Sequence, residues 1–348
     1  MSLSVHNLKK VYGDGPDAFV ALDDVSVDID TGTIFGVIGR SGAGKTTLLR
    51  CLNGLVQPDS GSVKISGANL SKAEGTTKRG ILQNVGTVFQ SYNLLSRQTV
   101  YNNIAFPLQV RGDNDTAIAE RVRWLSDRVG LTHKLHDYPS QLSGGQCQRV
   151  AIARALAANP DVLLCDEFTA ALDPETAFEI LGLLRQLNDE LNITVFLITH
   201  DMSVVREICD EVAVMDAGKI VEQDSVENIL IHPQHPVTNM LLKSLFEHDL
   251  PNALVNQMKE QPSGFKDDVV LRLVFSGEAA GKPLIAEVME RYKLQVNIIA
   301  GGVDHFRETG FGSLTISIPY NEKQTSIVKT FFAEHNVKLD IVGFVPHD

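Results

Sequence analysis

The sequence predicts an α/β protein with a larger domain built on a mostly parallel sheet and a smaller α+β domain after it. Three observations lead to this fold class. Short apolar runs alternate with helical patterns as far as about residue 230, which is typical of a parallel sheet covered by helices. A glycine-rich segment at 39–47 joins an apolar run to a helical one. Beyond residue 230 the order becomes βαββαβ, as in a ferredoxin-like domain.

The elements of the larger domain each have a pattern of their own. The run at 34–39 is apolar throughout, as in a strand buried on both faces. The helix after it has leucines at helical spacing, and the segment 111–130 has one apolar face. The sequence predicts strands at 3–8, 21–29, 34–39, 162–165 and 194–199, and helices at 45–55, 111–130, 145–158 and 174–191.

The smaller domain follows a segment rich in prolines and polar residues. We expect a first domain at 1–240, a linker at 241–268 and a second domain at 269–348. The predicted strands of the second domain are 269–275, 296–303, 313–319 and 337–345, and its helices are 283–292 and 322–334.

The composition is that of a globular chain and argues against nucleic acid as a partner. The 348 residues are 43% hydrophobic and 21% charged, with a formal net charge of −12, which excludes a disordered or collagen-like chain. Acidic side chains outnumber basic ones on both sides of residue 240. Electrostatic binding to DNA, RNA or anionic lipid is therefore disfavoured.

Cysteine spacing and hydropathy indicate the compartment. The four cysteines lie far apart without a CxxC pair, so we expect a reducing cytosol, no disulfide framework and no zinc site. No run approaches 18 apolar residues, and the N-terminus has no apolar core of signal-peptide length. We therefore expect no membrane-spanning segment.

The strongest motif is GRSGAGKTT at 39–47, which fits the phosphate loop G-x-x-x-x-G-K-[ST]. Its glycines let backbone N–H groups approach phosphate oxygens, Lys45 supplies charge to the β- and γ-phosphates, and Thr46 offers a hydroxyl to Mg²⁺. This motif between a strand and a helix predicts ATP binding. The nucleotide-binding residues of the loop would be Gly39, Arg40, Ser41, Gly42, Ala43, Gly44, Lys45, Thr46 and Thr47.

Two acidic residues end the apolar strand at 162–165. Unpaired buried charge is expensive, so the pair Asp166 and Glu167 needs an explanation. A Mg²⁺ ion held by Asp166 would provide one, with Glu167 polarising the attacking water. His200 ends the run TVFLITH, from which it could contact the γ-phosphate and hold Glu167 in register. These residues predict ATP hydrolysis with Glu167 and His200 as catalytic groups.

A second anion-binding geometry occurs at LSGGQ, residues 142–146. Ser143 and the N–H groups of Gly144 and Gly145 would lie at the N-terminus of the helix that follows. Because the chain already has a phosphate loop, this second site makes sense if it binds a nucleotide held by another subunit.

Together these motifs resemble the ATP-binding-cassette (ABC) ATPases. The resemblance covers roughly residues 2–240 and rests on GRSGAGKTT, Gln90 in VFQ, LSGGQ, LCDE, ALD at 171–173 and His200, in that order. It implies a domain with a helical subdomain and a head-to-tail homodimer that holds ATP between one phosphate loop and the partner's signature, Ser143 to Gln146. It also implies that Tyr12 stacks on adenine and that Gln90 is a third catalytic residue, which binds the metal and couples to a membrane subunit. Asp173 would communicate across the dimer.

The C-terminal part resembles the ACT-like regulatory domain of methionine import ATP-binding proteins. The stretch LRLVFSGEAAGKPLIAEVMERYKLQVNIIAGGVD carries the NIL signature of that domain as Asn297-Ile298-Ile299. The resemblance implies the ATPase of a D/L-methionine importer whose C-terminal domain senses cytosolic methionine for feedback inhibition. Asn297 is the candidate contact with that amino acid; the alternative is a residue that only caps a strand.

The same resemblance implies the partners and the location. The partners are two integral-membrane permease subunits and, through them, a methionine-binding protein, at the cytoplasmic face of the inner membrane. Two alternatives stay open: an ATPase subunit for another amino acid or solute, and a non-transport ATP-binding amino-acid sensor. Phe168 and Cys147 depart from the family pattern, but neither is a phosphate or metal ligand, so we still expect ATPase activity.

Overall fold

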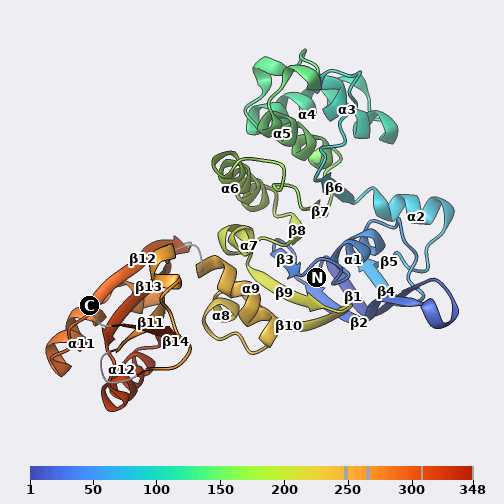
Figure 1. The fold of residues 1–348 in the computed structure, drawn as a ribbon. Coiled ribbons are helices and arrows are strands. Elements are labelled where there is room, and N and C mark those ends of the chain that lie inside the picture. Colours follow the sequence, from blue (N-terminus) through green and yellow to red (C-terminus); the bar gives the residue numbers. More distant parts are fainter. Residues whose placement is uncertain (247–249, 264–266, 307–308, 347–348) are drawn as a thin grey trace. The chain divides into compact units, whose positions relative to one another are not determined.

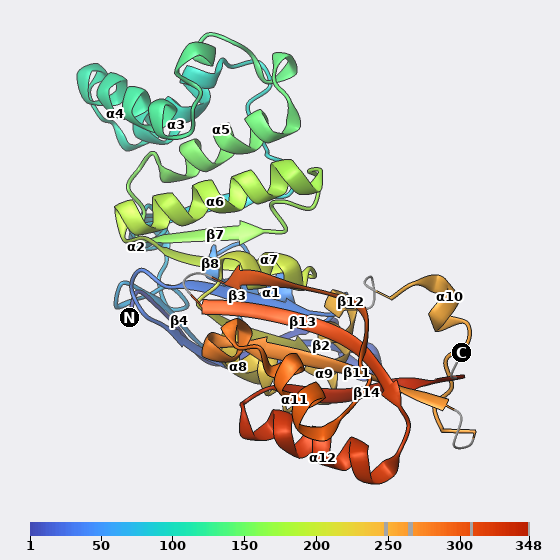
Figure 2. The same cartoon turned by 90° about the vertical axis from the view of Figure 1, so that its left-hand side faces the viewer.

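A computed structural model describes residues 1–246, 250–263, 267–306 and 309–346 (Figures 1 and 2). The chain forms two compact units, Met1–Val226 and Glu227–Asp348. The functional domain boundaries at 240 and 268 stay a prediction. Among the described residues, none of the helices combines the length and apolar character needed to cross a membrane.

The first unit is built on a six-stranded sheet in the order β10-β9-β3-β8-β7-β6. All neighbours are parallel except β10, which is antiparallel to β9. Strands β3 and β8 are buried along their whole length, which explains their continuous apolar sequence. This confirms the predicted mostly parallel α/β fold. The strands are β3 (Ile34–Gly39), β6 (Val85–Phe89), β7 (Val162–Asp166), β8 (Thr194–Thr199), β9 (Glu211–Asp216) and β10 (Lys219–Ser225).

The first strands form a separate antiparallel sheet in the order β2-β1-β4-β5, which the sequence analysis did not distinguish from the parallel one. Side chains of β1, β2 and β4 share one hydrophobic core with β3, β8 and helix α1. The core therefore fixes this sheet against the base of the phosphate loop. Its strands are β1 (Leu3–Tyr12), β2 (Phe19–Ile29), β4 (Ser60–Ile65) and β5 (Ala68–Asn69).

The helices of the first unit include a helical subdomain formed by α3, α4 and α5 (Figure 1). The helix predicted over 111–130 begins at Asp115, because Gly112 ends the preceding helix in a left-handed conformation with φ +89° and Asn114 caps the next one. The helices are α1 (Lys45–Leu52), α2 (Gly75–Leu82), α3 (Val100–Arg111), α4 (Asp115–Arg128), α5 (Gly144–Leu156), α6 (Pro174–Leu191) and α7 (Met202–Ile208).

The second unit contains a four-stranded antiparallel sheet in the order β12-β13-β11-β14. With helices α11 and α12 between the strands, this is the predicted ferredoxin-like arrangement. A core of aliphatic and aromatic side chains joins the sheet to both helices. The elements are α8 (Val226–Ile231), α9 (Pro236–Phe246), α10 (Asn252–Val255), β11 (Asp267–Ser276), α11 (Leu284–Tyr292), β12 (Asn297–Phe306), β13 (Thr309–Pro319), α12 (Glu322–Glu334) and β14 (Lys338–Pro346).

Candidate functional site

The carboxyl ends of four neighbouring parallel strands bring the predicted catalytic residues to one edge of the central sheet. Strand β3 ends at Gly39, β7 ends at Asp166, β8 leads to His200 and β6 leads to Gln90. Ligands of open α/β sheets bind at this edge. The register pairs that fix the arrangement are Ile38 with Thr199, Ile198 with Asp166, and Asp166 with Phe89.

The phosphate loop forms one wall of a pocket of about 480 Å³, within the size range of small-molecule sites. Gly44 has φ +106°, and a Cβ atom there would lie 2.4 Å from the carbonyl oxygen of Ala21. Only glycine fits this position. The loop thereby turns directly into the N-terminus of α1, whose first N–H groups have no partner within the helix. The pocket is lined by Phe19, Ala21, Glu167, His200 and residues 41–47.

Lys45 is held close to its own loop. It is 6% exposed, and its Nζ donates hydrogen bonds to the carbonyl oxygens of Gly39 at 2.7 Å and Arg40 at 3.0 Å. Burial lowers the pKa of Lys45, while Glu167 and Asp166 act in the opposite direction. The hydrogen bonds hold the ammonium group of Lys45 at the phosphate loop, where its positive charge would attract an anionic ligand.

Asp166 lies in an environment that favours a neighbouring cation. Burial and then the adjacent Glu167 raise the pKa of its carboxyl, against the opposing effect of Arg50 and Lys45. A divalent cation would favour the charged form. Thr46 lines the phosphate-loop pocket, and Gln90 follows Phe89, the register partner of Asp166; a hydroxyl, an amide and a carboxylate oxygen are a donor set that suits Mg²⁺. The described residues contain no cluster of three or more His, Cys, Asp or Glu side chains that could hold a metal.

Glu167 and His200 form a pair. The Oε2 atom of Glu167 lies 3.2 Å from Nδ1 of His200. Glu167 has φ +40°, and its N–H donates to the carbonyl oxygen of Ile198 at 3.0 Å. Left-handed backbone at a glutamate is strained, and strain of this kind is a recurrent feature of functional sites. The geometry thus supports the predicted roles of a base and of the residue that orients it.

The signature segment forms the N-terminus of α5. The hydroxyl of Ser143 accepts a hydrogen bond from the Gln146 N–H at 3.3 Å, and the Gln146 side chain accepts one from the Ser143 N–H at 3.0 Å. This capping box fixes the helix start. None of these residues lines the phosphate-loop pocket of the same chain.

The signature helix packs closely against the start of α6. A Cβ atom on Gly145 would lie 2.5 Å from Cγ2 of Thr176, so a larger residue would force the helices apart. Asp173 caps α6 by accepting a hydrogen bond from the Thr176 N–H at 3.0 Å, and this bond lowers the pKa of Asp173. Communication across a dimer by Asp173 remains a prediction.

A second polar pocket, of about 350 Å³, lies in the second unit. Asn297, the first residue of β12, lines it together with Gln295 and Asp268. Leu254 and Gln257, from the segment before the sheet, close it on another side. The remaining lining residues are Val296, Ile299, Ser317, Pro319, Val345 and Pro346.

Comparison with known proteins gives the family of both parts of the chain. Residues 22–170 match the family model for the ABC transporter, and residues 269–340 match that for the NIL domain. The chain is 42% identical over 340 residues to the methionine import ATP-binding protein MetN of Desulfitobacterium hafniense, covering 98% of this chain and 99% of that protein. It is 44% identical over 331 residues to MetN of Rhizobium meliloti, covering 95% and 92%. The chain belongs to the family of methionine import ATP-binding proteins.

Solved ABC cassettes resemble the first unit of this methionine import family member. A dimeric cassette in a post-hydrolysis state with ADP and Pi bound has a TM-score of 0.59 and 32% identity, covering 64% of this chain and 98% of that one. The structure of cbiO1 from Clostridium perfringens, part of an ABC transporter complex, has a TM-score of 0.62 and 32% identity, covering 66% and 91%.

Phe19 is a pocket residue that the sequence analysis missed. It lies opposite Tyr12 in the β1–β2 register, is 58% exposed and lines the phosphate-loop pocket, whereas Tyr12 does not line it. No local sequence signal marks Phe19, because its place opposite Tyr12 depends on strand register. Stacking of Tyr12 on adenine stays a prediction, and Phe19 is a second aromatic side chain available for that contact.

We predict that Phe19→Ala weakens ATP binding about fivefold, because an aromatic contact contributes about 1 kcal/mol beyond the area it buries. Isothermal titration with ATP measures the effect, and Phe178→Ala, at a 60% exposed phenylalanine of α6, is the matched control. Equal affinities for the Phe19 variant and the wild type would contradict this role.

The two departures from the family pattern fill space inside the first unit. Phe168 is 2% exposed and Cys147 is 9% exposed. Burial raises the pKa of the Cys147 thiol, which lowers the fraction of reactive thiolate. Both residues therefore act as packing groups beside the site.

Proposed function

We propose that this chain is the ATP-hydrolysing subunit of an importer that takes up methionine. The observation that carries the catalytic part is the Glu167–His200 pair, which lies in one pocket with the phosphate loop. The methionine assignment is supported by 42–44% identity along almost the whole length of two methionine import proteins.

The residues of the pocket divide the work of hydrolysis. The loop N–H groups and Lys45 bind the phosphates and offset the charge that develops on them. Glu167 accepts a proton from the attacking water, and His200 holds its carboxylate in the required orientation. Asp166, Thr46 and Gln90 would hold Mg²⁺, which would supply charge neutralisation on the phosphate oxygens when bound.

The signature completes the site in a second copy of the chain. Because the signature does not line the pocket of its own chain, its helix N-terminus is available to a nucleotide bound by a partner. The similar cassette with ADP and Pi is described as dimeric. We therefore propose a head-to-tail homodimer with two such composite sites.

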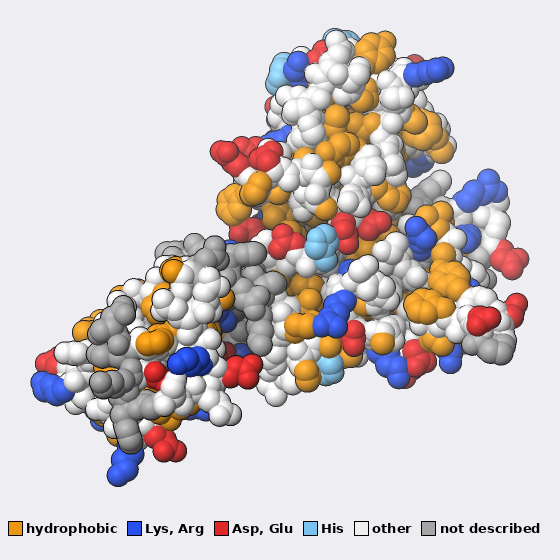
Figure 3. All heavy atoms as spheres, in the orientation of Figure 1, with side chains coloured by type: hydrophobic (Ala, Val, Ile, Leu, Met, Phe, Trp, Pro, Cys, Tyr) orange, Lys and Arg blue, Asp and Glu red, His pale blue; other side chains and the backbone are white. Residues whose placement is uncertain are grey.

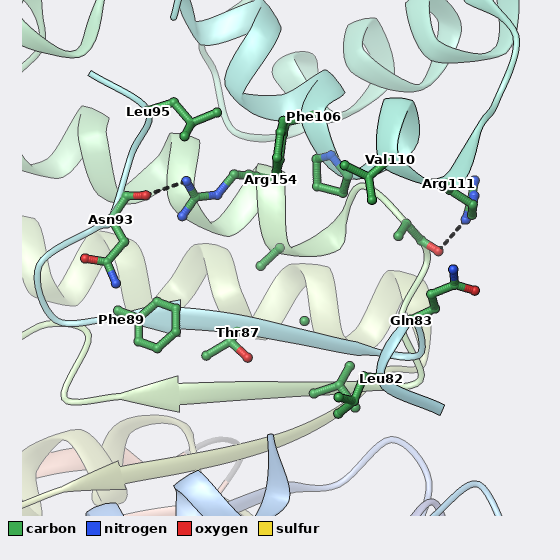
Figure 4. A pocket seen from close by; sticks show the side chains of 15 residues that line it. Leu82, Gln83, Thr87, Phe89, Asn93, Leu95, Phe106, Val110, Arg111 and Arg154 are labelled. Carbon is green, nitrogen blue, oxygen red and sulfur yellow. Dashed lines mark hydrogen bonds between the residues drawn. The ribbon is translucent and has the colours of Figure 1, made fainter. Parts of the chain in front are cut away.

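A groove beside β6 would receive the membrane partner. It has a volume of about 470 Å³ and is lined by β6, α3 and α5 (Figure 4). Phe106 and Val110 of α3 line it and are 46% and 71% exposed, and apolar side chains reach the surface over this region in Figure 3. Such a groove suits a short amphipathic helix. We propose that a cytoplasmic helix of each permease subunit docks there and holds the chain at the inner face of the membrane.

The test is hydrolysis by the assembled transporter. We expect turnover of this chain with its two permease subunits to rise when the methionine-loaded binding protein is added. A rise with the binding protein of a different solute, and none with methionine, would favour the alternative that the chain serves another amino acid or solute.

We further propose that the pocket around Asn297 binds methionine and mediates feedback inhibition. Asn297 and Gln295 offer amide groups to a carboxylate, Asp268 suits an ammonium group, and the aliphatic lining suits a thioether chain. Binding would inhibit if methionine has a higher affinity for the inactive arrangement of the two cassettes.

For Asn297→Ala we predict that half-inhibition of the transporter needs about tenfold more methionine, since a hydrogen bond to a charged group contributes about 1.5 kcal/mol. Inhibition curves measure this, and Gln324→Ala, exposed on α12 outside the pocket, is the control. An unchanged curve would contradict a contact between Asn297 and methionine. A full chain that binds ATP without turning it over, alone or with the permease, and gains thermal stability with an amino acid would favour the sensor alternative.

A further inference from the structure

The segment after Gln90 has an unusual backbone. Tyr92 and Asn93 both lie in the left-handed region, with φ +59° and +51°. Asparagine adopts this region readily, but a tyrosine there is strained and persists only when its surroundings hold it. The contacts that hold Tyr92 and Asn93 therefore show what this strain supports.

Arg154 of α5 is the group that holds this backbone. Its guanidinium donates to the carbonyl oxygen of Asn93 at 2.7 Å and to that of Tyr92 at 2.9 Å. Figure 4 shows the first of these bonds, with the arginine side chain extended from α5 towards the segment. Burial lowers the pKa of Arg154. Its guanidinium is thus partly removed from water, and its hydrogen bonds to the two carbonyl groups offset that cost.

The side chain of Tyr92 extends from that anchor towards the signature. A Cβ atom on Gly144 would lie 3.1 Å from the Tyr92 hydroxyl. Burial and then the nearby Cys147 thiol raise the pKa of Tyr92, as expected for a hydroxyl packed beside the start of α5. The backbone carbonyl of Tyr92 thus accepts a hydrogen bond from Arg154, near the end of α5. The hydroxyl of the same residue lies beside Gly144, the first glycine of the signature.

The same segment forms part of the groove. Asn93, Leu95 and Arg154 line it, while Tyr92 does not. An occupant of the groove therefore contacts Arg154, which binds the Tyr92 carbonyl, and Asn93, the next residue along the chain. The hydroxyl of Tyr92 lies beside Gly144 of the signature.

We propose that Tyr92 is a positioning residue that transmits occupancy of the groove to the signature motif, with Arg154 as its anchor. A helix docked against Asn93 and Arg154 sets the position of Tyr92, which in turn sets the position of Gly144 relative to the partner's nucleotide. This inference rests on the proposed docking of a permease helix in the groove.

The test separates basal hydrolysis from its stimulation. In the full transporter we expect Tyr92→Ala to reduce the stimulation of kcat by permease and loaded binding protein about tenfold, the size of a typical coupling between sites. Basal hydrolysis by the isolated chain, KM for ATP and co-purification with the permease stay within about twofold of wild type, as expected for a group that touches neither nucleotide nor permease.

Companion variants keep the result decisive. Tyr92→Phe, which keeps the ring and lacks the hydroxyl beside Gly144, gives an intermediate loss. Arg154→Lys also loses stimulation, because one ammonium group cannot replace the fork that spans two carbonyls. Tyr101→Ala, at a partly buried tyrosine of α3 that does not line the groove, keeps full stimulation.

Two results would overturn the inference. One is full stimulation of Tyr92→Ala in an intact complex; the other is a loss of basal and stimulated hydrolysis in equal proportion, which indicates a purely structural role. A wild-type chain that binds the permease and is not stimulated by it would instead overturn the proposed coupling between permease and ATPase. Failure of the Tyr92 inference is thereby distinguished from failure of the proposed function on which it rests.

Discussion

Replacement of Glu167 by Gln is expected to reduce ATP turnover about a thousandfold while ATP binding is retained, because general-base catalysis contributes about 10²–10⁴-fold. The amide keeps the size of the carboxylate but cannot accept the proton of the attacking water. Since Lys45 and the loop N–H groups are untouched, the nucleotide still binds. We also expect the ATP-bound dimer to accumulate, because its dissociation would follow hydrolysis.

Phosphate release and nucleotide titration measure the two halves of this prediction. Glu175→Gln is the matched control, because Glu175 lies in the first turn of α6 and does not line the pocket. More than a tenth of wild-type turnover in the Glu167 variant would show that another group acts as the base.

A charge placed in the signature is expected to stop hydrolysis without weakening ATP binding by the single subunit. Ser143→Arg removes one partner of the capping box and puts a bulky side chain at the N-terminus of α5. Loss of donors to developing charge costs about 10²–10³-fold in turnover. Because Ser143 does not line the pocket of its own chain, the affinity of the isolated subunit for ATP stays unchanged.

Mixing two inactive variants tests whether the signature acts on a partner's nucleotide. In a head-to-tail dimer of Ser143→Arg with Lys45→Ala, one site carries both changes and the other carries neither. We expect the mixture to hydrolyse more ATP than either variant alone. The opposite finding, that Ser143→Arg weakens ATP binding by the monomer as much as Lys45→Ala does, would place the signature in the site of its own chain.

The sequence predicted the fold wherever local pattern and burial agree. The helix from Pro174 to Leu191 and the strand from Thr194 to Thr199 have the predicted bounds, because a proline after an aspartate cap marks the helix start and an apolar run between two threonines marks the strand. The separate antiparallel sheet was missed, since strand partners depend on contacts distant in sequence. The sequence of a half-buried strand such as β1 does not indicate which sheet the strand joins.

The candidate site was predictable where the residue types that the chemistry needs occur at a fixed spacing in the sequence. The phosphate loop, the Asp166–Glu167 pair and His200 are of this kind, and the structure places them at one edge of the central sheet. Phe19 and the Tyr92–Arg154 contact were not predictable, because they depend on strand register and on a side chain that crosses between elements. No spacing rule relates such residues.

Methionine uptake by vesicles that contain the permease and this chain is the most direct test of the central claim. With ATP on the side of the chain and the methionine-binding protein on the other, we expect radiolabelled methionine to accumulate. Accumulation should stop with Glu167→Gln. It should also fall when excess methionine is present on the ATP side, where the Asn297 pocket would bind it. Absence of ATP-dependent methionine uptake by an assembled transporter that hydrolyses ATP, with accumulation of another solute instead, would contradict the account.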